Sequence, residues 1–506
     1  MTPSEDLFKL IKSLTPNEKG YFKKFSRIHV REGKNNYMLL FEAIDKQSIY
    51  EEQALIHKFR NEQFVKQFPV AKNYLYNLIL KALDVYHSGI DLEIGYLIHC
   101  SIILTDKAMF EPALKFLKKA ELISQEHHKL SYLNKILNHE LYIIRRDPTT
   151  KKKEVLDAHY KQRVENADQL RYVIEYQHLN DLMFEQFNRS FGPSRDEAIK
   201  ESKKLMEQPL MKKVPPDLSL YGQIEYHSTC LFYHSICLDH TEAFRVTSLL
   251  MNEVLKKYEN ILPSRMKILI MQNHCTSCIN TSKPDEAVRT LEKLKQIETT
   301  NDLERLTVFQ FIYLQELIIF LRSGRYDESL KVIEMVEKEL SEFGEKMQGN
   351  PKGFLFQLIA LTHFANAQYK EALKWVNRLL NSKLTETRND IINSAKLLEL
   401  LIFYETDKND IIHYKIESFE RSFKKDREKF KYELLMLSHF KKLLQLHRSS
   451  DVNSLAAKIK DELTIFIEKN PASKDVFYRF DIRDWLESKS TGRSLAEILC
   501  SGKGKK

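Results

Sequence analysis

A short sequence signature recurs along the chain about every 43 residues. A typical copy has a polar pair, then a small residue, then apolar residues further on, as in Asp285-Glu286-Ala287 with Leu291 and Leu294. A chain that repeats at this length is predicted to fold as an array of similar units, each of which buries its apolar face against its neighbours. The small residues of the six copies are Ala113, Ala198, Ala243, Ala287, Ser329 and Ala372.

Each signature opens a helix that follows an apolar helix and a short turn. The spacing of apolar residues predicts such preceding helices over Met266–Asn280, Thr307–Arg322 and Phe354–Ala367. The repeating unit is therefore predicted to be a helical hairpin, and the fold class is predicted to be all-α. A degenerate seventh copy is predicted around residues 412–419.

Glycine and proline are scarce in this chain. There are 13 of each in 506 residues, about 5% together, where an average soluble protein has roughly 12%. Parallel α/β enzymes need glycine at phosphate loops, and all-β folds need frequent turn residues, so both classes are excluded. Hydrophobic residues make up 43% of the chain, which is enough for large buried cores.

The hairpin unit resembles the tetratricopeptide repeat family. In that family the small residue that opens the second helix packs against a small residue twelve positions earlier, so that the two helices lie close together. Ser101, Cys275 and Ala360 fit these earlier positions, whereas Leu231 and Leu317 depart from the pattern.

The resemblance covers roughly residues 93–385, and the period is longer than the 34 residues of the family. The opening segment from Leu7 to Phe25 and the closing segment from Asp484 to Lys489 also look like those of uncharacterised bacterial tetratricopeptide-like proteins. The resemblance implies a right-handed superhelix of helical hairpins in a bacterial cytoplasm, and it implies no particular biochemical activity.

The repeats are predicted to lie between two other helical regions. Residues 1–90 are expected to form an N-terminal helical bundle, residues 91–400 the repeats, and residues 401–490 a C-terminal helical cap. Residues 491–506 form a basic tail that is predicted to be disordered.

The N-terminal region carries strong signals for helix starts. Thr2-Pro3-Ser4-Glu5 and Thr15-Pro16-Asn17-Glu18 are capping boxes, with Thr at the N-cap and Glu at the third helical position. Further helices are predicted over Tyr37–Lys46, Glu51–Arg60 and Pro69–Tyr86.

This region allows two interpretations. A long helix with the nearby basic residues Lys66, Lys72 and Lys81 is compatible with a helix-turn-helix that contacts DNA. The other interpretation is an ordinary bundle that covers the end of the repeats, and it is favoured because no Arg-rich face or compact turn is present. A second basic segment, His413 to Arg448, either docks on the repeats or contacts an acidic partner or a nucleic-acid backbone.

The sequence predicts a cytoplasmic protein. Six cysteines are too few for a disulfide-built scaffold, and the first residues lack the basic region of a signal peptide. The most apolar window, Phe309 to Leu321, is 13 residues long, whereas a bilayer span needs about 20. The net charge of +9 is a mild excess among 149 charged residues.

Two groups of cysteine and histidine residues raise the question of metal or redox chemistry. His227, Cys230, His234 and Cys237 follow one helical stripe, but residues seven apart lie about 10 Å apart along a helix and cannot close a zinc site alone. The segment from His274 to Cys278 contains a C-x-x-C, here inside a repeat helix. Both groups are therefore expected to be packing residues, and neither a metal nor a cofactor is predicted.

Catalytic motifs are missing from the sequence. The chain has no G-x-S-x-G, no H-E-x-x-H and no glycine-rich phosphate loop. The prediction is a non-enzymatic scaffold or adaptor. A DNA-binding regulator, with repeats that sense a peptide, is the alternative.

The predicted binding surface is the concave groove that the first helices of the hairpins would line. Amide and guanidinium groups there suit the backbone or carboxylates of a peptide, and two aromatic residues would add apolar contact. Projecting the register of the family onto this chain gives Gln272, Asn273, Asn280, Gln315, Arg322, Gln357, Phe232 and Phe364.

Overall fold

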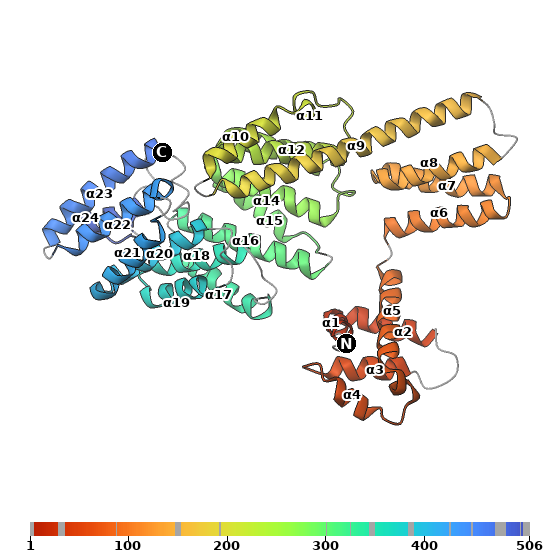
Figure 1. Cartoon of the computed structure of the whole chain (residues 1–506), viewed down its shortest axis with the longest axis horizontal. Coiled ribbons are helices and arrows are strands. Elements are labelled where there is room, and N and C mark those ends of the chain that lie inside the picture. Colours follow the sequence, from red (N-terminus) through yellow and green to blue (C-terminus); the bar gives the residue numbers. More distant parts are fainter. Residues whose placement is uncertain are drawn as a thin grey trace. The chain divides into compact units, whose positions relative to one another are not determined.

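The described part of the chain has an all-α fold. The described residues form 24 α-helices with short 3₁₀ and π segments, and no strand occurs among them, as the repeat pattern predicted. The chain divides into two compact units, residues 1–167 and 168–506 (Figure 1). This computed structural model describes residues 5–28, 36–87, 89–146, 153–191, 194–299, 301–323, 325–343, 350–382, 389–424, 427–446, 449–470, 482–495 and 497–498.

The first unit begins with helices that share one hydrophobic core. Fully buried side chains such as Ile11, Phe41 and Leu75 come from different helices and meet in its centre. The helices predicted in this region are confirmed, each end to within two residues. The bounds are α1 (Asp6–Ser13), α2 (Pro16–Ile28), α3 (Asn36–Lys46), α4 (Glu52–Lys58) and α5 (Phe68–Tyr86), with a 3₁₀ turn at Gln63–Gln67.

The capping box before α2 is present. The amide of Thr15 donates to Oε2 of Glu18 over 2.7 Å, and the amide of Glu18 donates to Oγ1 of Thr15 over 3.3 Å. Two amides that a helix start would leave unpaired are thereby satisfied. The other predicted box begins at residues 2–4, which lie outside the described residues.

A second core in this unit belongs to three antiparallel helices that lie side by side in Figure 1. Its centre contains Ile98, Ala113 and Ile136. The long helix α9 then runs from the first unit into the second. The bounds are α6 (Ile90–Asp106), α7 (Phe110–Glu126), α8 (Leu130–Arg146) and α9 (Lys153–Arg189).

The second unit begins with a smaller core that includes Tyr176 and Ala243, and then continues as helices that pack in neighbouring pairs along a large core from Leu220 to Leu486. This arrangement is compatible with a helical-repeat solenoid. Its first helices are α10 (Arg195–Met206), α11 (Pro209–Lys212), α12 (Leu220–Ile236), α13 (His240–Leu249), a π segment (Leu250–Leu255), α14 (Ser264–Asn280), α15 (Pro284–Lys295), α16 (Asp302–Ser323) and α17 (Tyr326–Phe343).

The remaining helices complete the same core. Helix α24 packs along α23, and the indole Nε1 of Trp485 donates to Oε1 of Glu405 over 2.6 Å. Lys489 also pairs with Glu405, at 2.7 Å, so both residues fasten α24 to α20. The bounds are α18 (Asn350–Ala365), α19 (Tyr369–Leu380), α20 (Asn389–Glu405), α21 (Asn409–Ser422), a 3₁₀ turn (Arg427–Phe430), α22 (Lys431–Leu444), α23 (Ser449–Lys469) and α24 (Ile482–Thr491).

No helix among those described is by itself long and apolar enough to cross a membrane; the segments Gln63–Tyr86 and Ile90–Asp106 reach that length and composition only as a bent pair.

The small residues of the repeat signature are buried where helices pack together. All six are buried, with at most 4% of the side chain exposed. In the α14–α15 pair, Sγ of Cys275 lies 3.7 Å from the carbonyl oxygen of Ala287. A larger side chain at either position would push the helices apart, which explains why the sequence repeats a small residue there.

The turns inside the hairpins share one backbone conformation. The second residue after the first helix has a φ of 54–58°, and it lies five positions before the small residue of the repeat signature, or before residue 412 in the degenerate copy. The next amide donates to the carbonyl five residues earlier, as from Asp239 to His234 over 2.8 Å. This is the hydrogen bond of a Schellman motif. The left-handed residues of these turns are Ala108, Leu238, Ser282, Ala367 and Asp407.

Substitution of Ala367 by glycine is expected to stabilise the second unit by about 0.5–1 kcal/mol. A left-handed conformation costs an L-residue roughly 1–2 kcal/mol, part of which the greater freedom of glycine in the unfolded chain offsets. Ala367 is exposed, so little packing is lost. Equilibrium unfolding in urea measures the change. The control is Ala457→Gly, in the exposed middle of α23, where glycine should destabilise by about 1 kcal/mol. Changes of the same sign in both variants would contradict the role of the turn.

Candidate functional site

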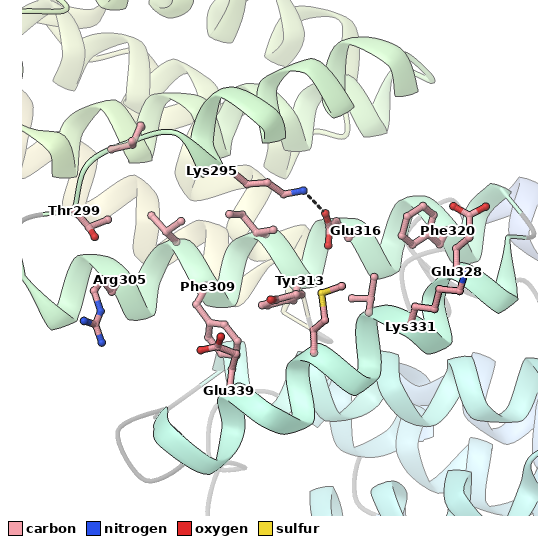
Figure 2. A pocket seen from close by; sticks show the side chains of 15 residues that line it. Lys295, Thr299, Arg305, Phe309, Tyr313, Glu316, Phe320, Glu328, Lys331 and Glu339 are labelled. Atoms are coloured by element: carbon pink, nitrogen blue, oxygen red, sulfur yellow. Dashed lines mark ion pairs between the residues drawn. The ribbon is translucent and has the colours of Figure 1, made fainter.

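One cavity in the described part of the chain has a volume of about 870 Å³. It is lined by the end of α15 with the residues that follow it, by one face of α16 and by α17. Figure 2 shows Thr299 and Arg305 at one end of it and Phe320 and Glu328 at the other. We call this cavity the α15–α17 groove.

The groove exists because α15 is short. Helix α15 has 12 residues and α16 has 22, so α16 is about 15 Å longer at a rise of 1.5 Å per residue. Lys295, the last residue of α15, pairs with Glu316 at 2.8 Å (Figure 2). Glu316 lies 14 residues into α16. The earlier turns of α16 lie beside residues 296–299, which follow α15, and a longer α15 would pack there instead.

The floor of the groove is apolar. Residues of α16 line it at helical spacing, from Val308 and Phe309 to Ile312 and Tyr313. Phe309 and Ile312 are each 8% exposed because they also contact the core below. Met335, which comes from α17, is 53% exposed. An exposed thioether above an apolar floor is typical of a surface that a partner covers.

Charged residues of both signs border this floor. Burial alone would lower the pKa of Lys295, but its hydrogen bonds to Glu316 and Glu292 outweigh burial and raise that pKa. Burial raises the pKa of Tyr313, and the negative charge of Glu339 raises it further, so the hydroxyl stays protonated at neutral pH. The charged residues of the border are Lys295, Arg305, Lys331, Glu316, Glu328 and Glu339.

The groove residues predicted from the repeat register lie elsewhere. None of those with described side chains lines the α15–α17 groove, and the side chain of Arg322 lies outside the described part. Gln272, Asn273 and Asn280 are half-buried on α14. Their role in binding stays a prediction.

Three further predicted residues are engaged inside the fold. Nε2 of Gln315 donates to Oγ1 of Thr276 over 3.5 Å, and Nε2 of Gln357 donates to Oγ of Ser394 over 2.5 Å. These amides connect the first helices of successive hairpins. Phe364 is 2% exposed, so it is a core residue in this structure and not the exposed contact that the register predicted.

Phe232 belongs to an aromatic cluster of the second unit. Its ring lies 5.2 Å from that of Phe184 and 5.1 Å from that of Phe187, both on α9. The side chain is half-buried. It therefore contributes to the packing of α9 on α12.

The lysines of the DNA-binding alternative do not share one surface. Lys72 pairs with Glu52 at 2.5 Å, whereas Lys66 and Lys81 are exposed. Lys72 and Lys81 are nine residues apart on α5, which places them on opposite sides of the helix. Val70 also lies exposed on α5, at 62%.

The two cysteine–histidine groups differ in the structure. Among the described residues, the His227–Cys237 stripe does not bring three metal-binding atoms within 4.8 Å of one another. The C-x-x-C thiols are fully buried, and burial raises the pKa of Cys278 to about 12 and that of Cys275 further. Such thiols are poor nucleophiles, which argues against redox exchange at this motif.

The sequence contained one signal for the α15–α17 groove. The first residues of the apolar window from Phe309 to Leu321 form the floor. The early end of α15 carries no signal that a periodicity argument would find. Comparison of the chain with models of protein families, with curated proteins and with solved structures finds no match.

Proposed function

We propose that this chain is a non-enzymatic protein-interaction scaffold that binds an amphipathic helix of a partner protein in the α15–α17 groove. The observation that supports it is the apolar cavity along one face of α16, which the half-buried Val308 and Tyr313 line together with the exposed Met335. A partner helix laid there would continue the layer that α15 leaves unfinished. Helix-in-groove binding uses apolar residues at i, i+3, i+4 and i+7, and the floor offers complementary apolar positions.

The border of the groove indicates the chemistry of the partner. Three cations and three carboxylates flank the apolar floor, so the formal charge of the border is zero. A helix with an apolar stripe and flanking residues of both signs fits this border better than a nucleic-acid backbone, which needs an excess of cations.

We further infer that the hairpins form a right-handed tetratricopeptide-like superhelix, in a bacterial cytoplasm. The recurring buried small residue and the recurring Schellman turn support this inference, because a constant hairpin geometry repeated along a chain generates a superhelix. The superhelix would present the groove on a rigid array.

Photocrosslinking from the groove tests the proposed function. A benzophenone amino acid at Met335 should crosslink a protein segment in the native host, whereas the same group at Val288, exposed on α15 outside the groove, should not. The crosslink should survive nuclease treatment. A nuclease-sensitive crosslink at Met335, or equal crosslinks at both positions, would argue against the proposal.

The crosslinked segment then allows a quantitative prediction. A synthetic peptide of that segment should bind with at least about tenfold lower affinity to Met335→Asp than to the unaltered chain, because the introduced carboxylate loses its water on an apolar floor. Val288→Asp is the matched control and should bind as before. Fluorescence anisotropy gives the two dissociation constants, and circular dichroism of the bound peptide should show helix. Equal affinities would exclude the groove as the binding site.

A further inference from the structure

Three side chains with metal-binding atoms meet where α14 turns into α15. His274 and Cys278 are one helical turn apart on α14, and Glu286 lies in the first turn of α15. The tight turn at Ser282 brings the two helix ends together. As a result, one ligand atom from each side chain lies within 4.8 Å of the other two.

Two of the three separations are close to those around a tetrahedral zinc ion, and the third is within 4.8 Å. Sγ of Cys278 lies 3.6 Å from Nε2 of His274, which lies 3.1 Å from Oε1 of Glu286. Zinc bonds of about 2.0–2.3 Å at tetrahedral angles put neighbouring ligand atoms roughly 3.3–3.6 Å apart. The imidazole and the thiol therefore need almost no movement. The Glu286 side chain is 36% exposed, so the three ligand atoms are accessible to solvent on its side.

The imidazole of His274 is oriented by a second hydrogen bond. Oγ1 of Thr247 donates to the carbonyl of Phe244 over 3.1 Å, so its lone pairs face Nδ1 of His274 at 3.3 Å. The tautomer with its proton on Nδ1 donates to Thr247 and leaves the lone pair of Nε2 for a metal ion, whereas without a metal Nε2–H donates to the carboxylate of Glu286. Metal-binding histidines are typically held in this way, by a partner on the nitrogen that does not bind the metal.

The charges of the three groups also suit a divalent cation. One thiolate and one carboxylate together carry two negative charges, which a divalent cation neutralises. The nearby cations are Lys283, Arg289 and Lys293.

We propose that Nε2 of His274, Sγ of Cys278 and the carboxylate of Glu286 bind one Zn²⁺ ion per chain, with water at the fourth position. On binding, the thiol of Cys278 releases its proton to solvent and the thiolate bonds to the metal. The bound ion clamps the last turn of α14 to the first turn of α15. The site does not depend on the α15–α17 groove, and its failure would leave the proposed function untouched.

Cobalt substitution tests the ligand set on the full chain after treatment with a chelator. One equivalent of Co²⁺ should produce a thiolate-to-cobalt charge-transfer band in the near ultraviolet, together with the visible bands of a four-coordinate ion. Zn²⁺ should displace both. Cys278→Ser should abolish the charge-transfer band, whereas Cys275→Ser, a buried thiol on the same helix, should retain it. A band that persists in Cys278→Ser, or that never forms, overturns the proposal.

A second measurement keeps the test valid if Cys278→Ser does not fold. Zn²⁺ should raise the melting temperature of the unaltered chain, because a ligand that binds only the folded state stabilises it. Glu286→Gln should bind Zn²⁺ at least about tenfold more weakly in calorimetry. Its control is Glu292→Gln, an exposed carboxylate on the same helix. Equal affinity of the unaltered chain and Glu286→Gln would overturn the proposal.

Discussion

Replacement of Trp375 by alanine is expected to lower the free energy of unfolding of the second unit by about 3–5 kcal/mol. Trp375 on α19 is the largest fully buried side chain among the described residues, with 1% exposed. Its ring lies 5.2 Å from that of Phe356 on α18. Alanine would leave a cavity of indole size between α18 and α19. Neighbouring helices pack against both of them, so the two helices cannot easily close the cavity. Unfolding in guanidinium chloride, followed by circular dichroism, measures the loss.

The matched variant is Trp375→Phe, and it should stay within about 1 kcal/mol of the unaltered chain. Nε1 of Trp375 is buried without a hydrogen-bond partner in the described structure, and such an unpaired donor costs about 1–3 kcal/mol. Phenylalanine removes the donor while it keeps most of the apolar volume. If alanine and phenylalanine cost the same, the stability does not come from the buried ring.

Substitution of Ala287 by tryptophan is expected to destabilise the second unit by about 1–3 kcal/mol, through overpacking of a tight helix pair. Ala287 is fully buried, and Sγ of Cys275 lies 3.7 Å from its carbonyl oxygen. The larger side chain would have to separate α14 from α15. Hydrogen exchange of these two helices, measured with the unfolding free energy, should locate the damage in this hairpin.

The adjacent position supplies the control for that substitution. Val288 is 42% exposed on the same helix, and Val288→Trp should change the unfolding free energy by no more than about 0.5 kcal/mol. A neutral result for Ala287→Trp would contradict the assignment of the repeat signature to the contact inside the hairpin. Loss of stability in both variants would point to helix propensity as the cause.

Most of the hairpins could be predicted because their signals are local or periodic. The capping box at Thr15 needs only four neighbouring residues, and its hydrogen bonds form as expected. The helix predicted over Met266–Asn280 is present as α14, two residues longer at its start. Buried small residues recur because closely packed helices leave no room for a larger side chain at these positions. These features depend on contacts within one unit.

Predictions about exposure were less successful, because exposure depends on elements distant in sequence. Phe364 occupies a position that the tetratricopeptide register places toward the groove, yet it lies 2% exposed in the core. Gln357 is similarly covered, since it donates to Ser394 on α20. Helix α20 precedes only the degenerate copy of the signature, so the repeat pattern does not indicate that α20 covers Gln357. The register therefore identifies a helix face but not what covers that face.

The repeat pattern, the low glycine and proline content and the capping motifs determined by themselves that this chain is all-α and built from helical pairs, because the hydrogen bonds and apolar periodicity of a helix are local. Only the tertiary structure decided where the surface opens and where side chains converge. The α15–α17 groove arises from the unequal lengths of two packed helices, and Glu286 reaches His274 and Cys278 only through the turn at Ser282. Both features depend on where one helix ends against its neighbour, which is set by packing across the fold.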